Sequence, residues 1–455
     1  MSKILEGPIW RVILISVALF LAWQIVTINM ADHYVNKIVI EGDEAALDKA
    51  LWWDAGHPRA LTLKAARLLS QGDVETAEPM LQEAVRANPA DARPLLLLAN
   101  IQLERGNTDV SDQMADLANT FMPVNYQVQK GLAAYWEERG QYEKAIAHLA
   151  TALEAKHQLR DELYPVFLRI AENPAARELM APIAAEPPKW WDGFVWYAAK
   201  NAENLDTLRI LAAMRKQAED YPFTERERSS FIWRLRKEGL IAEAYMVWVN
   251  GLDKEQRGAL GYVYNGNFER DLMNSGFGWH ARPPKNSGII INTAVTYGIE
   301  GKEALFMSFK GKRVRFSHLS QPLFLDTGVY RLTGKVRPDK LKARKGLKWY
   351  VWCTSGAKGK VGESEAFLGT GDWRQFEFDI TVPPECRGQT LQLRSIGNRD
   401  VDHEIRGEIW FDDLHIQLLR DVVDIDDADE GAQGSEVEAK EASKDASSAG
   451  NGGKK

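Results

Sequence analysis

The stretch GDVETAEPMLQEAVRANPAD, residues 72–91, recurs along the chain in diverged form. Its counterparts are GNTDVSDQMADLANTFMPVN at residues 106–125 and GQYEKAIAHLATALEAKHQL at residues 140–159. The copies begin at Gly72, Gly106 and Gly140, a constant spacing of 34 residues. A fixed period of this length is typical of stacked helical hairpins, in which glycine closes the turn between two helices. One hairpin cannot bury its apolar face alone, so the units stack.

This pattern resembles the tetratricopeptide repeat. The match is good over residues 58–91 and 126–159 and weaker over residues 92–125, and Gly239, Ala244 and Trp248 take equivalent places in a later unit. We therefore expect an all-α solenoid over residues 43–253. The resemblance implies protein partners but does not name them, because such repeats bind many proteins.

An uncharged run of 20 residues, Val12 to Ala31, lies near the N-terminus. About 20 apolar residues span a bilayer core, so we expect a transmembrane anchor at residues 9–31. A cleaved signal peptide or a buried core helix is the alternative. Lys3 and Arg11 precede the run, and the positive-inside bias then places residues 1–8 in the cytoplasm. In a bacterium, this makes a single-pass inner-membrane protein with its bulk in the periplasm.

Helical periodicity ends after Gly261. Short candidate strands separated by Gly, Pro, Asn and Asp follow, and their number predicts an all-β jelly-roll sandwich over residues 265–418. Residues 254–264 are expected to be a linker. The segment 421–455 holds ten acidic residues and four lysines and has no aromatic residue, so we expect a disordered acidic tail.

The sandwich region resembles carbohydrate-binding modules of the cellulose- and xylan-binding class. The resemblance rests on NGNFE at 265–269, on the Gly-Trp pair at 278–279 and on IWFDDL at 409–414. It implies the jelly-roll fold and an ancestral sugar site. It also implies a structural calcium ion held by Glu269 and Asp413, although both carboxylates could instead serve the fold alone.

Candidate glycan contacts lie on one predicted strand and its preceding loop. Sugar rings stack on flat aromatic side chains, and Trp349, Tyr350 and Trp352 supply three. Because side chains alternate along a strand, Trp349 faces away from the other two, so at most one of the two sets forms a platform. Arg337 and Lys345 belong to a basic segment that either contacts an anionic polysaccharide or is simply solvated. Trp279, Trp373 and Trp410 are expected in the core.

The two cysteines of the chain are Cys353 and Cys386. One lies in a predicted strand and the other in a turn before a later strand, and neighbouring segments of a sandwich can bring such residues together. We expect a disulfide in an oxidising compartment, with two buried free thiols as the alternative.

Function is predicted to be binding rather than catalysis. The sequence contains no nucleophile elbow, phosphate loop or metalloprotease motif. The net charge of -7 comes almost entirely from the tail and says little about a partner, but a composition that is not clearly basic does not suggest a nucleic-acid binder. The domain combination resembles anchored components of bacterial exopolysaccharide synthesis and export. This implies an envelope protein whose repeats hold protein partners and whose sandwich contacts glycan. The alternatives are a protein–protein scaffold without a sugar site and, less favoured, a polysaccharide-modifying enzyme.

Overall fold

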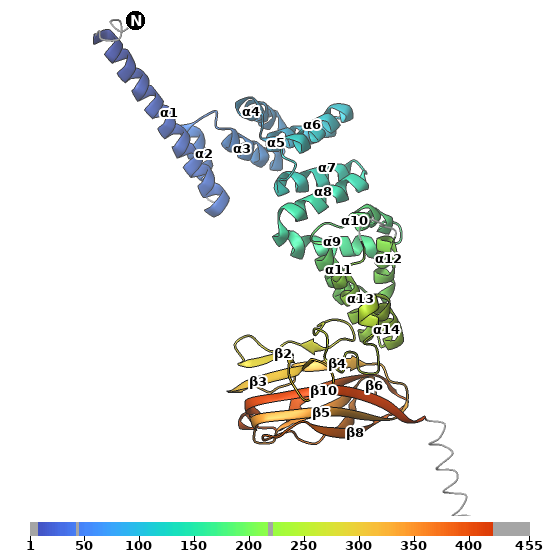
Figure 1. Ribbon diagram of the computed structural model, residues 1–455. Helices are drawn as coiled ribbons and strands as arrows, with labels where there is room; N and C mark the ends of the chain where they lie inside the picture. Colours follow the sequence, from blue (N-terminus) through green and yellow to red (C-terminus); the bar gives the residue numbers. More distant parts are fainter. Residues whose placement is uncertain (1–7, 42–44, 217–221, 422–455) are drawn as a thin grey trace, which may run out of the picture. The chain divides into compact units, whose positions relative to one another are not determined.

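The structure is a computed structural model that describes residues 8–41, 45–216 and 222–421. It confirms the predicted fold class: an apolar N-terminal helix, a run of helical hairpins and a C-terminal antiparallel β-sandwich (Figure 1). The chain divides into two compact units, residues 1–194 with 210–222 and residues 195–209 with 223–455.

Helices form the first part of the chain. Their bounds are α1 Pro8–Glu41, α2 Ala45–Trp53, α3 Pro58–Ser70, α4 Val74–Ala87, α5 Ala92–Glu104, α6 Thr108–Phe121, α7 Tyr126–Glu138, α8 Tyr142–Ala155, η2 His157–Leu159, α9 Arg160–Glu172, η3 Arg177–Met180, α10 Ala181–Ala185, α11 Trp191–Asn201, α12 Leu205–Lys216, α13 Glu225–Lys237, α14 Ile241–Asn250 and α15 Lys254–Arg257.

The predicted glycines close the hairpins. Gly72 joins α3 to α4, Gly106 joins α5 to α6, and Gly140 joins α7 to α8, with φ of 82°, 80° and 69°. Gly239 does the same between α13 and α14 with φ 80°. A side chain at these left-handed positions is unfavourable, which explains why the glycine is the most regular residue of the period.

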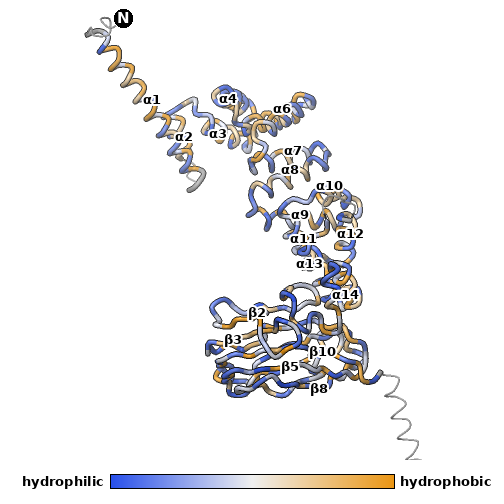
Figure 2. Tube along the Cα trace, in the orientation of Figure 1, coloured by the Kyte–Doolittle hydropathy of each residue, from blue (hydrophilic) through white to orange (hydrophobic). Residues whose placement is uncertain are grey.

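Helix α1 contains a segment, Trp10–Ile38, that is long and apolar enough to cross a membrane. Its apolar side chains are exposed over the first two thirds of the helix, and Figure 2 shows this apolar stretch in orange. Near its C-terminal end the helix becomes part of the fold, because Ala31 and Val35 are fully buried. The structure therefore contains the predicted candidate anchor, and it extends the helix beyond residue 31.

Within the described residues, ten antiparallel strands form the sandwich. Their bounds are β1 His280–Ala281, β2 Ile289–Val295, β3 Glu303–Arg313, β4 Leu319–Leu323, β5 Gly328–Lys342, β6 Leu347–Gly356, β7 Gly359–Glu363, β8 Arg374–Val382, β9 Cys386–Ser395 and β10 Glu404–Asp421.

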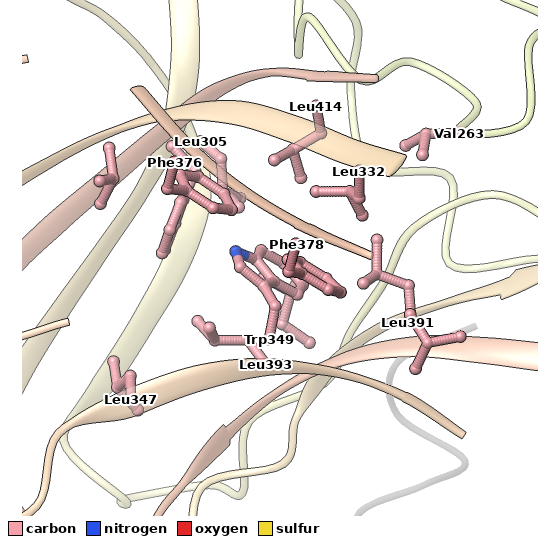
Figure 3. Close-up of a cluster of buried hydrophobic side chains, with 14 of the residues drawn as sticks. Val263, Leu305, Leu332, Leu347, Trp349, Phe376, Phe378, Leu391, Leu393 and Leu414 are labelled. Carbon is pink, nitrogen blue, oxygen red and sulfur yellow. The ribbon is translucent and has the colours of Figure 1, made fainter. Parts of the chain in front are cut away.

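The strand order is β1-β4-β9-β6-β7-β8-β5-β10-β3-β2. A single residue pair, Gly362 with Ile380, joins β7 to β8. The strands on either side of that junction form two layers, β1-β4-β9-β6-β7 and β8-β5-β10-β3-β2. Apolar side chains from both layers meet in one core, which includes Trp349, Phe376 and Leu391 (Figure 3).

A disulfide joins Cys353 of β6 to Cys386 at the start of β9, with a Cα–Cα distance of 5.6 Å. This is the pairing expected from the sequence. It closes a loop with a sequence separation of 33 residues, and it ties together two neighbouring strands of the same layer.

Two predicted boundaries fall inside ordered structure. The expected linker, residues 254–264, contains α15, and its last residues Val263 and Tyr264 are buried. Strand β10 continues to Asp421, beyond the expected end of the sandwich at 418. The expected tail beyond this residue lies outside the described part of the chain, as do the first seven residues.

Candidate glycan-binding surface

Strand β6 divides its aromatic side chains between the two faces of its layer. Its residues alternate between buried and half-buried from Leu347 to Cys353. Trp349 is fully buried, and its ring centroid lies 5.8 Å from that of Trp279 and 5.2 Å from that of Phe411. The strand's alternation therefore removes Trp349 from the candidate glycan contacts, because this side chain fills the core.

Tyr350 and Trp352 lie on the outer face of β6 and are half-buried. Their ring centroids are 5.7 Å apart and their planes are inclined by 32°. Across the ladder, Gln392 of β9 faces Tyr350, and Thr390 faces Trp352. The Gln392 amide donates a hydrogen bond to the Ser317 carbonyl oxygen at 2.8 Å, which fixes its orientation. Two rings beside oriented polar groups are the elements that a sugar-binding surface needs.

Charged side chains surround this aromatic pair. Lys348 and Lys360 lie 3.8 and 3.0 Å from the carboxylate of Glu363. The hydrogen bond from Lys360 holds the pKa of Glu363 below its usual value. The guanidinium of Arg394 lies 5.2 Å from the Trp352 ring centroid, and within the described residues it makes no ion pair. Together, Lys348, Tyr350, Trp352, Lys360, Glu363, Gln392 and Arg394 define what we call the β6–β9 surface.

Tyr350 keeps its hydroxyl proton on this surface. Burial raises the pKa of the phenol, and the negative charge of Glu363 adds to the effect. The indole Nε1 of Trp352 is enclosed and lacks a hydrogen-bond partner among the described residues. The Tyr350 hydroxyl therefore offers a donor beside the two rings, whereas the enclosed Nε1 of Trp352 does not.

Arg337 and Lys345 lie away from the aromatic pair. Arg337 belongs to β5 in the other layer, where its guanidinium lies 5.4 Å from the ring centroid of Trp373 and 5.0 Å from that of Trp410. Lys345 is exposed in the turn before β6. The structure therefore separates the five candidates for glycan contact. Tyr350 and Trp352 share a surface, and Trp349 is in the core. Arg337 is on the other layer, and Lys345 is in a turn.

Trp373 and Trp410 correct an expectation. They were expected in the core, but both are half-buried on the outer face of their layer. Ile409 and Phe411, the neighbours of Trp410, are fully buried, so alternation turns Trp410 outward. Phe306 on β3 packs against it with a centroid distance of 4.5 Å. Phe306, Arg337, Trp373 and Trp410 define the β5–β10 surface.

The carboxylates expected to hold calcium have partners in the protein. Glu269 Oε1 accepts hydrogen bonds from the backbone N–H groups of Lys302 and Glu303, at 2.7 and 2.9 Å. Asp413, at φ 54°, lies in a bulge of β10, and its carboxylate is 3.5 Å from Lys335 Nζ. The described residues contain no group of three or more His, Cys, Asp or Glu side chains arranged to hold a metal ion.

Sequence reasoning missed Asp412. Its side chain is buried, and its Oδ1 has no hydrogen-bond partner among the described residues. Burial raises the pKa of this carboxyl from 3.8 to about 7, and the charges of Asp413 and Glu269 add to the effect. An enclosed oxygen near a second carboxylate fits a cation.

Comparison with known families supports the repeats. Residues 68–119 match the family described as tetratricopeptide repeat. The predicted repeats are confirmed. Comparison of the chain with curated proteins gave no match.

Solved structures of two kinds are similar to this chain. The CBM22-1 xylan-binding domain of Xyn10C from Paenibacillus barcinonensis has 16% identity and a TM-score of 0.25, over 34% of this chain and 94% of that domain. TmCBM61 in complex with β-1,4-galactotriose has 20% identity and a TM-score of 0.24, over 35% and 99%. Pseudomonas aeruginosa pilF has 16% identity and a TM-score of 0.27, over 51% and 98%. At these scores the similarities carry no argument about ligand or partner.

Proposed function

We propose that this protein is a non-enzymatic, membrane-anchored binding protein whose sandwich holds a glycan chain on the β6–β9 surface. The observation that carries the proposal is the outward-facing pair of Tyr350 and Trp352, with ring centroids 5.7 Å apart. The apolar faces of successive sugar rings can stack on such a pair, while the amide of Gln392 and the hydroxyl of Tyr350 bind sugar hydroxyls.

The charge of the β6–β9 surface favours an acidic polysaccharide. It carries three cations, Lys348, Lys360 and Arg394, against one acid, Glu363. Glu363 neutralises part of the lysine charge, whereas Arg394 has no acidic partner among the described residues. A guanidinium binds a carboxylate through two parallel hydrogen bonds, so Arg394 is suited to a uronic acid residue stacked on Trp352.

The remaining parts are assigned to anchoring and assembly. Helix α1 would cross the bacterial inner membrane once, with the N-terminus in the cytoplasm and the bulk in the periplasm. The disulfide between Cys353 and Cys386 supports an oxidising compartment. The tetratricopeptide repeats would hold envelope proteins, and the whole chain would serve the synthesis or export of a polysaccharide.

Polysaccharide retention tests the proposed site. We expect the full chain, purified in detergent, to be retarded in native gels containing alginate, a uronic acid polymer. Trp352→Ala should weaken retention because one stacked ring is worth about 1 kcal/mol, or about fivefold in Kd. The matched control is Trp410→Ala, which removes another half-buried indole from the other layer and should leave retention unchanged.

Two outcomes would overturn the glycan proposal. Equal losses in both variants would show that retention does not depend on the β6–β9 surface. A native chain that alginate, xylan and β-1,4-galactan all fail to retard would leave the scaffold function, in which repeats and sandwich both bind proteins.

A further inference from the structure

Helix α2 ends in two adjacent tryptophans that no part of the proposed glycan site uses. Trp52 is 76% exposed, an unusual fraction for the largest side chain. Its ring centroid lies 5.0 Å from that of Trp53, and the Trp53 centroid lies 6.3 Å from that of Trp23 in α1. The pair therefore lies beside the apolar helix.

The packing of α2 shows how far it returns along α1. Leu47 and Ala50 pack against Val35, and Trp53, one turn further on, reaches Trp23. Trp23 comes eight residues before Ala31, the end of the uncharged run. At a rise of 1.5 Å per residue, this is about 12 Å inside the end of that run. The last turn of α2 thus lies alongside Trp23, where the polar residues Gln24, Thr27 and Asn29 begin to interrupt the apolar run, so we place the headgroup–acyl boundary at this level of α1 and not at Ala31.

Polar contacts limit how deeply the residues that follow Trp53 can lie in the bilayer. His57 Nε2 lies 3.2 Å from the carboxylate of Asp32, the first charged residue after the apolar run. Asp54 follows the tryptophan pair directly, and its carboxylate accepts a hydrogen bond from the Gly56 N–H at 3.0 Å. A charged residue at the bilayer centre is costly, so the chain beyond Trp53 must return to the water-facing side.

We propose that Trp52 and Trp53 insert into the headgroup–acyl boundary of the membrane beside α1, as a second attachment of the protein to lipid. This inference rests on the proposed anchoring by α1. Tryptophan is enriched at this boundary because its ring is apolar while its N–H can bond to polar groups. The exposed ring of Trp52 faces the bilayer, and α3 begins just after the return at His57. The first repeat is thereby held at the membrane surface.

The depth of residue 52 can be measured in the full chain. Both native cysteines are joined in the disulfide, so a single introduced cysteine carries a nitrobenzoxadiazole fluorophore in phosphatidylcholine–phosphatidylglycerol vesicles. We expect nitroxide lipids labelled near the headgroup to quench Trp52→Cys more strongly than lipids labelled deep in the chain. Val124→Cys is the matched control, since Val124 is also 76% exposed but belongs to the repeats, and it should not be quenched.

Two further probes make the outcome decisive. Ala55→Cys keeps both tryptophans and should show the same shallow quenching. Leu19→Cys, within the apolar run, reports insertion of α1 and should be quenched by the deep label. Quenching at Leu19 without quenching at positions 52 and 55 would overturn the inference and leave the anchor intact. Absence of quenching at Leu19 would overturn both. If position 52 is shielded from lipid and from aqueous iodide alike, a protein surface covers it and the inference is wrong.

Discussion

The two outer surfaces of the sandwich contain tryptophans of similar exposure in different surroundings. On the β6–β9 surface, three cations face one acid, and Arg394 has no acidic partner among the described residues. On the β5–β10 surface, Arg337 lies between the indoles of Trp373 and Trp410. Asp339 and Glu408 form the next cross-strand pair on the same face. Exposure alone does not identify a sugar platform. A guanidinium lies over a tryptophan ring on both surfaces, and it is the charge around the rings that distinguishes the two.

The core that supports both surfaces gives the largest expected effect. Trp349→Ala should destabilise the sandwich by about 3–5 kcal/mol, because it empties a fully buried site between the layers. Denaturant unfolding of the full chain, followed by near-ultraviolet circular dichroism, measures the change. Trp352→Ala, two residues further on the outer face, is the control and should cost far less. Equal costs would contradict the assignment of these side chains to opposite faces.

The disulfide joins two strands, β6 and β9, of the layer that contains the β6–β9 surface. Replacing both Cys353 and Cys386 by serine should lower stability by about 3–4 kcal/mol in the chain-entropy model. Thiol titration of unfolded, unreduced protein from cells should find no free thiol in the native chain. Two free thiols would remove both the bond in vivo and one support for a periplasmic location.

The tryptophans of the two outer surfaces should differ in what their loss affects, stability or alginate retention. Trp410→Ala should cost about 1 kcal/mol of stability, since it removes the ring packed on Phe306 and one of the two indoles around Arg337. Alginate retention should persist in Trp410→Ala. Trp352→Ala should instead weaken retention and have the smaller effect on stability. Thermal unfolding and native gels on the same preparations measure both quantities. A loss of retention in Trp410→Ala at full stability would assign the site to the β5–β10 surface.

The pH dependence of stability tests Asp412, which lies in the layer of the β5–β10 surface. Its folded pKa, raised from 3.8 to about 7, exceeds the unfolded value. The folded state therefore binds the proton more tightly, and this group's contribution to stability is lost as pH rises from about 4 to about 7. Asp412→Asn should flatten that part of the stability profile. Calcium should raise the melting temperature of the native chain near neutral pH, but not that of the variant.

An unchanged pH profile in Asp412→Asn would show that the carboxyl is not buried as described. Stabilisation of both proteins by calcium would place any ion elsewhere. Stabilisation of neither would leave Asp412 as a buried acid without a metal.

The sequence alone determined the features that depend on local chain geometry. The spacing of Gly72, Gly106 and Gly140 predicted the hairpins, because a left-handed turn residue and a repeated apolar face are local requirements. The uncharged run to Ala31 predicted the apolar helix. Turn-separated strands predicted the sandwich, and alternation along the strand put Trp349 opposite Tyr350 and Trp352.

Only the tertiary structure decided which face of each strand is inside. Alternation is symmetric, so the sequence left open whether Trp349 or the Tyr350–Trp352 pair fills the core, and the packing of Trp279 and Phe411 on Trp349 settles it. The same holds for Arg337, which the basic segment placed near the aromatic strand and the sheet order places in the other layer. Asp412 is buried although alternation from Phe411 turns it to the outer side of its layer, which the strand pattern alone does not predict. Such features arise from pairing between strands far apart in the chain, and no local pattern encodes that pairing.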